Sequence, residues 1–431
     1  MTVMLGLANK KKEQSKKVVV IGIDGLPFSL INEYMRQGVM PQFRQMTREG
    51  SFLRMKSSLP EVSSVAWTSF MTGKNPGEHG IFGFMELDDN YCYRFPNFKD
   101  IKVPTFWEKL DVPSVIINLP QTYPAVRPLK GVLVSGFVAI DLRRAVYPQN
   151  AYSKLEEIGY RLDVKAKLAS EDPDGFFVDL FEVFESRLKA IRYFFDHTEW
   201  QIFVGTITAT DRLHHYFYPQ ALGEGPYHGK MLEFYGKLDA FLGEIYEKAK
   251  DQGCIFLTCS DHGFTPITSE VYLNRWLIEN GYLLLEDTSK GLERISGNSL
   301  AFCLDPGRIY IHLKDRYPRG CVARSDYKSL RKDLAEKLSQ ITFNGKKVIK
   351  RTYLREEIFN GPYTVLGPDI YLLPYPGFDL KGAVDRPTVF GTSHFTGMHT
   401  YDDAHLFISS DHKLSTPTIT DIASLIEGHF F

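Results

Sequence analysis

The sequence predicts an α/β fold with a mainly parallel central sheet flanked by helices. Short, continuous apolar runs rich in β-branched residues recur along the chain, as expected for strands that are buried on both faces. Amphipathic segments of helical spacing lie between these runs, and alternation of strand and helix gives a parallel sheet with right-handed crossovers. The predicted strands are Val18 to Ile23, Ser114 to Asn118, Gly131 to Phe137, Trp200 to Thr206 and Cys254 to Ser260.

The helices are predicted from the spacing of apolar residues between the strands. The stretch from Leu30 to Glu49 has helical spacing and ends at Gly50, a residue type that favours the end of a helix. Two longer amphipathic segments, from about Phe176 to His197 and from Gly229 to Lys250, are also expected to be helical. These segments supply the layers that would cover the sheet.

From about Phe264 to Phe390 the pattern of apolar and polar residues is less regular, and the segment is rich in aromatic residues. We expect this segment, 264–390, to be an inserted cap or substrate lobe. The α/β core is then formed by 17–263 and 391–431. The first residues, 1–16, end in a run of lysines and are expected to be a flexible basic tail.

Composition excludes several classes of protein. The 431 residues are 43% hydrophobic and 24% charged, as in ordinary folded proteins, and the formal net charge of -1 gives no field to attract nucleic acid. No apolar run approaches the ~20 residues needed to span a bilayer. The N-terminal segment places apolar residues before basic ones, which is the reverse of a signal peptide. Five cysteines without a CxxC pair favour a reducing compartment, so we expect a cytoplasmic protein.

Asp24 follows the first predicted strand in the segment IGIDG. In open α/β sheets, ligands bind outside the carboxyl ends of the strands, so this position suits a functional carboxylate. Taken alone, however, an Asp after a strand more often stabilises the next turn.

Ser63 and Ser64 lie in the segment LPEVSSVAWTSFMTGKNPGEHGI, where Pro60 disfavours helix and a helical run through Met71 follows. A Ser at a helix N-terminus faces free backbone N–H groups and the positive end of the helix dipole, both of which favour an anion such as phosphate. A plain helix cap is the commoner event. The length of the segment and its TGKNPGEHG continuation argue against that simpler interpretation.

Two Asp and His pairs follow successive predicted strands. Asp211 and His215 are four residues apart, so on a helix they share one face and can bind the same ion. His214 would point elsewhere and serve a structural role. Asp261 and His262 are adjacent on a tight turn after the next strand and can supply two ligands, or one ligand and a bridging carboxylate. Each pair alone is weak evidence, but two pairs at the ends of successive buried strands are much stronger.

One more His is expected near the C-terminus. His394 and His399 both precede the last predicted strand, LFISS, in the segment GTSHFTGMHTYDD. A lone His in a loop is usually structural, but a further metal ligand is wanted to complete two sites.

In this order, five segments resemble the type I phosphodiesterase and nucleotide pyrophosphatase branch of the alkaline-phosphatase superfamily: IGIDG, PEVSSVAWTSFMTGKNPGEHGI, TDRLHH, SDHGF and GMHTYDD. The motif-bearing segments span 18–84, 200–264 and the last forty or so residues. As an ordered set they are highly specific, although no single one is. The resemblance implies an alkaline-phosphatase-like sandwich and two divalent metal ions, typically Zn²⁺, with Mn²⁺ as the alternative.

The resemblance also implies a role for each motif residue. Ser63 would be the nucleophile and also a ligand of one metal, and the backbone N–H of Ser64 would contact the substrate. His399 is preferred over His394 because the family's His stands in a Gly-x-His setting. One metal would be held by Asp24, Asp261 and His262, and the other by Asp211, His215 and His399. Two such ions would clamp the attacking and leaving oxygens of an in-line displacement, through a phosphoserine intermediate.

The sequence departs from the family at one position that bears on the substrate. Nucleotide pyrophosphatases of this branch usually carry an Asn three residues after the nucleophile, where this chain has Ala66. The arginine with which alkaline phosphatases hold a monoester cannot be located in the sequence. The sulfatase signature is absent. These departures weaken the nucleotide assignment more than the hydrolase assignment.

The leading hypothesis is therefore a metal-dependent phosphodiesterase or nucleotide pyrophosphatase that acts on a small phosphoester substrate. A phosphomonoesterase or a phosphonate hydrolase is the alternative, and an Arg or Lys contributed by 264–390 would favour it. A phosphoglycerate mutase ranks lower because no arginine cluster lies near the motifs. A non-catalytic binding protein also ranks low, because every expected ligand position is filled by a usable side chain.

Overall fold

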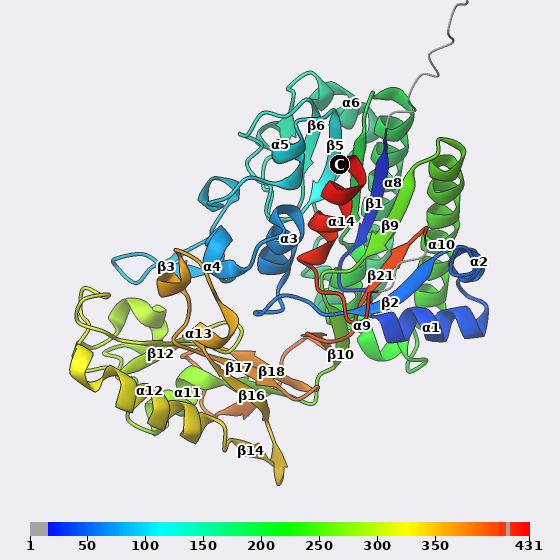
Figure 1. Ribbon diagram of the computed structural model, residues 1–431. Helices are drawn as coiled ribbons and strands as arrows, with labels where there is room; N and C mark the ends of the chain where they lie inside the picture. The colour runs from blue at the N-terminus through cyan, green and yellow to red at the C-terminus, as the bar shows by residue number, and fades with distance from the viewer. Residues whose placement is uncertain (1–15, 411–413) are drawn as a thin grey trace, which may run out of the picture.

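The computed structural model describes residues 16–410 and 414–431, and an eight-stranded sheet forms its centre (Figure 1). Across the sheet the order is β2 (Ser51–Met55), β21 (Ala404–Ile408), β9 (Ile255–Cys259), β1 (Val18–Ile23), β8 (Ile202–Ile207), β5 (Ser114–Leu119), β6 (Gly131–Ser135) and β7 (Val146–Tyr147). The block from β9 to β6 is parallel, whereas β2, β21 and β7 pair antiparallel with their neighbours.

The predicted fold class is confirmed. The five strands predicted from the sequence are the five of the parallel block, and each lies within two residues of its expected bounds. The last predicted strand, β21, also forms, but it runs antiparallel at the side of this block. The predicted tail lies outside the described residues except for Lys16.

Both faces of the sheet are covered by helices, because the strands bury side chains on both faces. In β1, Val19, Ile21 and Ile23 contribute to one apolar cluster, whereas Val18 and Val20 contribute to another. The first cluster includes α1 (Phe28–Gln37), α2 (Pro41–Met46), α6 (Ala151–Ile158), α8 (Pro173–His197), α9 (Ala209–Ala221) and α10 (His228–Asp251). The second includes α3 (Ser63–Thr72), α5 (Phe106–Leu110) and α14 (Asp421–Phe430).

The single helix expected from Leu30 to Glu49 is wrong, because the structure divides this stretch into α1 and α2. Gly38 ends α1 in the left-handed region, at φ 77°, which glycine adopts without steric cost. Pro41 then opens α2, where its missing N–H costs no helical hydrogen bond. Apolar spacing continues across the break, so it could not reveal the break by itself.

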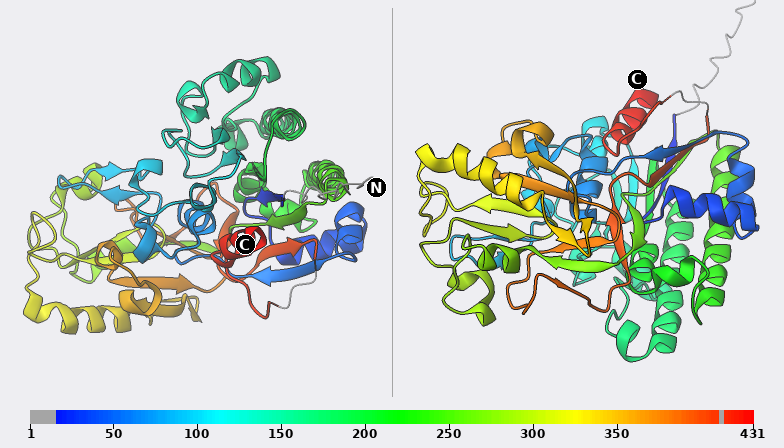
Figure 2. Two further views of the ribbon diagram at one scale, coloured as in Figure 1. Left: turned by 45° about the horizontal axis from the view of Figure 1, so that its top comes forward. Right: turned by 90° about the horizontal axis from the view of Figure 1, so that it is seen from below.

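The segment 269–390 lies to one side of the sandwich in all three views (Figures 1 and 2). It has its own apolar cluster, two small sheets and a two-stranded hairpin of β14 (Thr342–Phe343) and β15 (Lys346–Lys347). Helices α11 (Leu273–Glu279), α12 (Arg324–Leu338) and α13 (Arg355–Ile358) belong to the same segment. One sheet orders β12 (Ala301–Leu304), β13 (Arg308–Ile311), β17 (Ile370–Pro374) and β16 (Ile349–Leu354); the other orders β18 (Phe378–Lys381), β11 (Ser269–Tyr272) and β19 (Phe390–Gly391). The domain limits at 264 and 390 stay a prediction.

The chain leaves and rejoins the core through one antiparallel pair of strands. Strand β10 (Gly263–Pro266) follows the Asp261-His262 turn and pairs with β20 (Gly397–Thr400), with Phe264 opposite His399. A His far along the chain is thereby placed beside the carboxyl end of β9.

No helix among the described residues is long and apolar enough to cross a membrane. All five cysteines lie within the described part of the chain and are free thiols.

Candidate active site

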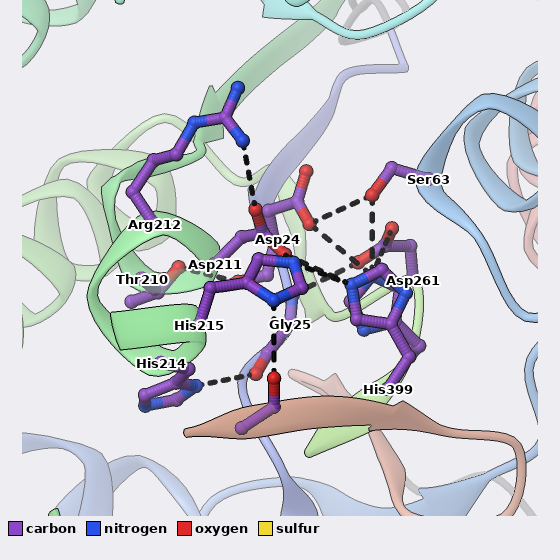
Figure 3. Close-up of polar contacts among 12 residues, drawn as sticks. Asp24, Gly25, Ser63, Thr210, Asp211, Arg212, His214, His215, Asp261 and His399 are labelled. Carbon is purple, nitrogen blue, oxygen red and sulfur yellow. Dashed lines mark hydrogen bonds and ion pairs between the residues drawn. The ribbon is translucent and has the colours of Figure 1, made fainter. Parts of the chain in front are cut away.

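The predicted site residues gather at one edge of the parallel sheet (Figure 3). Strands β9, β1 and β8 are adjacent and parallel, so their carboxyl ends meet. Asp24 directly follows β1, Asp211 lies in the first turn of α9 after β8, and the Asp261-His262 pair follows β9. Three carboxylates and an imidazole from distant parts of the chain therefore face the same space.

Asp24 is held in a fixed orientation from several sides. Trp67 Nε1 donates to Asp24 Oδ2 at 3.0 Å, and Thr210 Oγ1 donates to its backbone carbonyl at 2.5 Å. The other carboxylate oxygen, Oδ1, lies 3.3 Å from Ser63 Oγ and 3.6 Å from His262 Nε2. One oxygen is thus engaged by the core, and the other is left for the site.

The Trp67 ring that holds Asp24 packs directly on β1, and this contact leaves no room for a side chain at Gly22. A Cβ atom at Gly22 would lie 2.6 Å from the end of the Trp67 ring. We expect Gly22→Ala to destabilise the fold by about 1–3 kcal/mol through overpacking, as measured by urea unfolding. Gly229→Ala, at a helical position where the new Cβ meets nothing within 4 Å, is the control and should be neutral or slightly stabilising. Equal stability of Gly22→Ala and the original protein would contradict the contact.

Ser63 is the first residue of α3, and its hydroxyl points into the carboxylate cluster. Ser63 Oγ lies 3.2 Å from His262 Nε2 as well as 3.3 Å from Asp24 Oδ1. The first intrahelical bonds of α3 run from Val65 N and Ala66 N. Within 16–410 and 414–431 the N–H groups of Ser63 and Ser64 have no hydrogen-bond partner, so they can bind an anion. The Ala66 side chain is fully buried in the apolar cluster, so it offers no polar contact to a substrate.

A second group of ligand atoms forms around Asp211. Its Oδ1 lies 3.3 Å from Nε2 of both His215 and His399, and these two Nε2 atoms are 3.1 Å apart. The rings of His399 and His262 stack with centroids 3.5 Å apart, which brings the two groups together. The ligand atoms of Asp211, His215 and His399 lie within 4.8 Å of one another, and so do those of Asp24, Asp211 and His262.

The ring nitrogens of the three histidines are oriented for binding a cation. Each Nδ1 contacts a backbone carbonyl, which requires Nδ1 to be the donor: His399 to Glu61 at 2.9 Å, His215 to Gly397 at 3.2 Å, and His262 to Gly263 at 3.1 Å. In the neutral ring, Nε2 then carries a lone pair. Outer bonds of this kind fix metal-binding histidines.

The electrostatics of the cluster favour positive ions. Burial raises the pKa of Asp24 well above its usual value, and the carboxylates of Asp261 and Asp211 add to the rise. Burial likewise raises the pKa of Asp261 to about 6. Burial opposes ionisation of Asp211 too, but the imidazoles of His215 and His399 bring its pKa well below the usual value. Three buried carboxylates this close repel one another unless cations compensate their charge.

Two buried carboxylate oxygens without a hydrogen-bond donor indicate that metal ions fit this site. Asp211 Oδ1 and Asp261 Oδ2 are buried and accept no hydrogen bond within the described residues. A buried carboxylate oxygen without a partner costs free energy unless it binds a cation. The donor set of carboxylate oxygens and imidazole nitrogens suits Zn²⁺ and also Mn²⁺. The residues present therefore fit two divalent ions, with Asp211 common to both groups and Asp261 fixed on its other oxygen by Gly25 N at 3.0 Å.

Two other histidines near the motifs lie outside this cluster. His214 is buried on the opposite side of α9, where its Nδ1 donates to the carbonyl of Gly25 at 2.9 Å and its Nε2 lies 2.5 Å from the hydroxyl of Tyr235. This is the structural position expected for it. His394 is exposed in the loop before β20, whereas His399 lies within the cluster.

A cavity of about 290 Å³ adjoins the cluster, between the core and 269–390. His215 and His399 form one wall, and Phe395 packs on His215 with ring centroids 4.9 Å apart. Most of the remaining wall is apolar, but two cations, Arg212 and Lys381, and three acids, Glu61, Asp305 and Asp379, also line it. Lys381 Nζ is paired with Asp379 at 2.7 Å.

The sequence analysis missed five charged residues that line the cavity: Glu61, Arg212, Asp305, Asp379 and Lys381. The buried carboxylate of Glu61 is held by the hydroxyl of Tyr371, from β17, and burial raises the pKa of Glu61. Arg212 could have been found because it directly follows Asp211. No signal in the sequence points to Lys381, which only the fold brings to the cavity.

Comparison with known proteins places the chain among a group of phosphoester hydrolases. The family model described as "Type I phosphodiesterase / nucleotide pyrophosphatase" matches residues 18–402.

Solved structures of similar fold include phosphonoacetate hydrolase from Sinorhizobium meliloti 1021 in complex with phosphonoacetate, at 16% identity and a TM-score of 0.65, covering 97% of this chain and 96% of that one. Murine ectonucleotide pyrophosphatase/phosphodiesterase 5, as an inactive variant in complex with AMP, has 13% identity and a TM-score of 0.58, covering 96% and 95%. The human form has 13% identity and a TM-score of 0.55, covering 95% and 94%.

Proposed function

Because the chain belongs to the type I phosphodiesterase/nucleotide pyrophosphatase family of the alkaline-phosphatase superfamily, we propose that it is a two-metal-dependent phosphodiesterase with Ser63 as nucleophile. The observation that carries this proposal is the position of the Ser63 hydroxyl. It stands at the start of α3, within 3.3 Å of Asp24 Oδ1 and 3.2 Å of His262 Nε2, beside free backbone N–H groups.

The two metal sites follow from the clusters around Ser63. We assign Asp24, Asp261 and His262, with Ser63, to one ion and Asp211, His215 and His399 to the other. Among the described residues Asp261 lies in neither group of mutually close ligand atoms, and its assignment is supported by the 3.2 Å between its Oδ2 and His262 Nε2. The carboxylate of Asp211 also lies within reach of the first ion. When bound, the two ions would supply Lewis-acid stabilisation of the charge on the attacking and leaving oxygens.

The chain's own residues account for the remaining steps. Ser63 Oγ loses its proton to solvent and attacks phosphorus, and the bond to the leaving alcohol or phosphate oxygen breaks as the new P–O bond forms. The free N–H groups of Ser63 and Ser64 hold a non-bridging oxygen. Water then attacks the phosphorus of the Ser63-bound phosphoester, which still carries the second ester group of the substrate. The P–Oγ bond breaks, the phosphomonoester product leaves, and the Ser63 hydroxyl is regenerated with retention of configuration at phosphorus after two displacements.

Phosphomonoester or phosphonate hydrolysis is the second candidate, because a specific observation favours it. Lys381, contributed by 264–390, lines the cavity together with Arg212. A cation from that segment is the feature that a dianionic phosphoryl group would need. The similar fold that bound phosphonoacetate is consistent with this candidate. Small substrates are favoured in either case, since a cavity of about 290 Å³ is at the low end for ligand sites.

Hydrolysis of matched chromogenic esters distinguishes these functions. The protein, reconstituted with Zn²⁺ or with Mn²⁺, is assayed on bis(p-nitrophenyl) phosphate, p-nitrophenyl phosphate, a p-nitrophenyl nucleotide ester and phosphonoacetate. We expect the diesters to react fastest, and we expect a chelator to abolish turnover until metal is restored. Faster release from the monoester or from phosphonoacetate would support the second candidate. Turnover that survives complete metal removal would contradict the two-metal assignment.

A further inference from the structure

Arg212 is a side chain at the site that the proposed mechanism has not used. It follows Asp211 on α9 and lines the cavity beside His215 and His399. Its side chain is 19% exposed, so most of it is buried while part still faces the cavity. A guanidinium is charged at any working pH and presents donors in a fixed plane.

Two of the three nitrogens of the Arg212 guanidinium are engaged and one is left. Nη2 donates to Asp163 at 2.7 Å and Nε donates to the same carboxylate at 3.2 Å, which is a side-on, bidentate pair. The guanidinium also stacks over the ring of Phe137, 4.3 Å from its centroid. The group is therefore held rigidly before any ligand arrives.

The third nitrogen, Nη1, faces the metal cluster. It lies 3.6 Å from Asp211 Oδ2 and makes no hydrogen bond with any residue of 16–410 or 414–431. Nη1 thus offers free donors toward the space that Ser63 also faces (Figure 3).

This geometry answers a need of the proposed reaction. Phosphoryl transfer places negative charge on the non-bridging oxygens, and Ala66 supplies no side-chain donor to them. Resting on the function proposed above, we propose that Arg212 contacts the substrate, with Nη1 donating to one non-bridging oxygen of the phosphoryl group. Asp163 is the positioning residue that aims it. Arg212 on α9 would then supply the donor that the family usually supplies by an Asn at the position of Ala66 on α3.

The matched variants are Arg212→Gln and Arg192→Gln. Arg192 has a similar arrangement away from the site: it pairs with Glu244 through Nε and Nη2, both at 2.8 Å, and stacks over Phe241 at 5.2 Å. We expect Arg212→Gln to lower kcat/KM on a phosphodiester by about 10²-fold, the loss typical of one oxyanion donor, with metal content unchanged. Arg192→Gln should stay within about twofold, because the half-buried ion pair and the ring contact that it loses lie away from the site.

A stereochemical readout separates contact with the substrate from a structural role. The separated Rp and Sp forms of a p-nitrophenyl phosphorothioate diester carry sulfur in place of one or the other non-bridging oxygen. If Arg212 contacts only one of these oxygens, Arg212→Gln changes the Rp/Sp ratio of kcat/KM, whereas a general loosening of the site lowers both rates together. An unchanged ratio would overturn the proposal.

Calorimetric titration of the Zn²⁺-loaded protein with inorganic phosphate measures phosphate binding, and it tests the role of Arg212 independently of turnover. We expect Arg212→Gln to weaken phosphate binding at least tenfold and Arg192→Gln to leave it unchanged. If the original protein hydrolyses no ester but shows this difference in binding, the proposed function fails and the Arg212 contact stands. Equal phosphate affinity in all three proteins would overturn the contact, whatever the enzyme hydrolyses.

Discussion

Replacing Ser63 by Ala is expected to lower kcat/KM by roughly 10⁴- to 10⁶-fold, the range seen when a hydrolase loses its nucleophile. The reason is that Ser63 Oγ is the hydroxyl directed at both Asp24 Oδ1 and His262 Nε2. The carboxylates and imidazoles that hold the metals are untouched, so metal content measured by atomic emission should stay near that of the original protein. Mass spectrometry of acid-quenched enzyme should also lose the covalent intermediate, in which Ser63 carries the phosphoryl group together with the ester group that the diester retains.

Ser64→Ala is the matched control. Ser64 is equally buried, but its Oγ has no hydrogen-bond partner within the described residues, and the backbone N–H assigned to the substrate is retained in Ala. We expect its rate to remain within a few-fold of the original. A fast Ser63→Ala protein and a slow Ser64→Ala protein would show that the nucleophile was assigned one residue too early.

The second large effect is expected from His399→Ala, which should lose one of two bound ions and most of the activity. His399 Nε2 stands 3.3 Å from Asp211 Oδ1 and 3.1 Å from His215 Nε2, so its removal leaves that cluster with two ligands. Losing even an outer partner of a ligand typically costs 10- to 100-fold in metal affinity, and losing a ligand should exceed about 100-fold. Titration with Zn²⁺ against a competing chelator measures the change.

The control for this variant is His394→Ala, five residues earlier, in the loop before β20. His394 is exposed, and it belongs to neither group of ligand atoms among the described residues. Its replacement should leave both the metal stoichiometry and kcat unchanged. Loss of metal in His394→Ala with retention in His399→Ala would show that the two histidines had been assigned the wrong way round.

Much of the fold was predictable because the apolar runs in the sequence coincide with the buried strands of the parallel block. A strand buried on both faces needs a continuous apolar run, so the sequence predicts β1, β5, β6, β8 and β9 directly. The break between α1 and α2 was missed because apolar spacing continues across Gly38 and Pro41. The direction of β21 was not predicted, because pairing depends on contacts between residues far apart in sequence.

The candidate site was predictable in its ligands and not in its other residues. Asp24, Asp211 and Asp261 each follow a buried strand, and parallel topology alone brings such positions together. Arg212 was overlooked because its orientation depends on Asp163, 49 residues away. Lys381 reaches the cavity only through the packing of 269–390 on the core, which no local pattern records.

The bond between Tyr371 and Glu61 has a consequence for how such an enzyme can be re-engineered. Exchanging the segment 264–390 for that of a relative is the obvious way to change the substrate while keeping the metal ligands. Yet Glu61 is two residues before Ser63, its backbone carbonyl orients His399, and its buried carboxylate depends on a hydroxyl supplied by β17. A chimaera whose exchanged segment lacks that hydroxyl would leave the Glu61 carboxylate buried without its hydrogen-bond donor, next to the nucleophile. The exchangeable unit is therefore the segment together with position 61, and chimaeras should be designed with the two as one cassette.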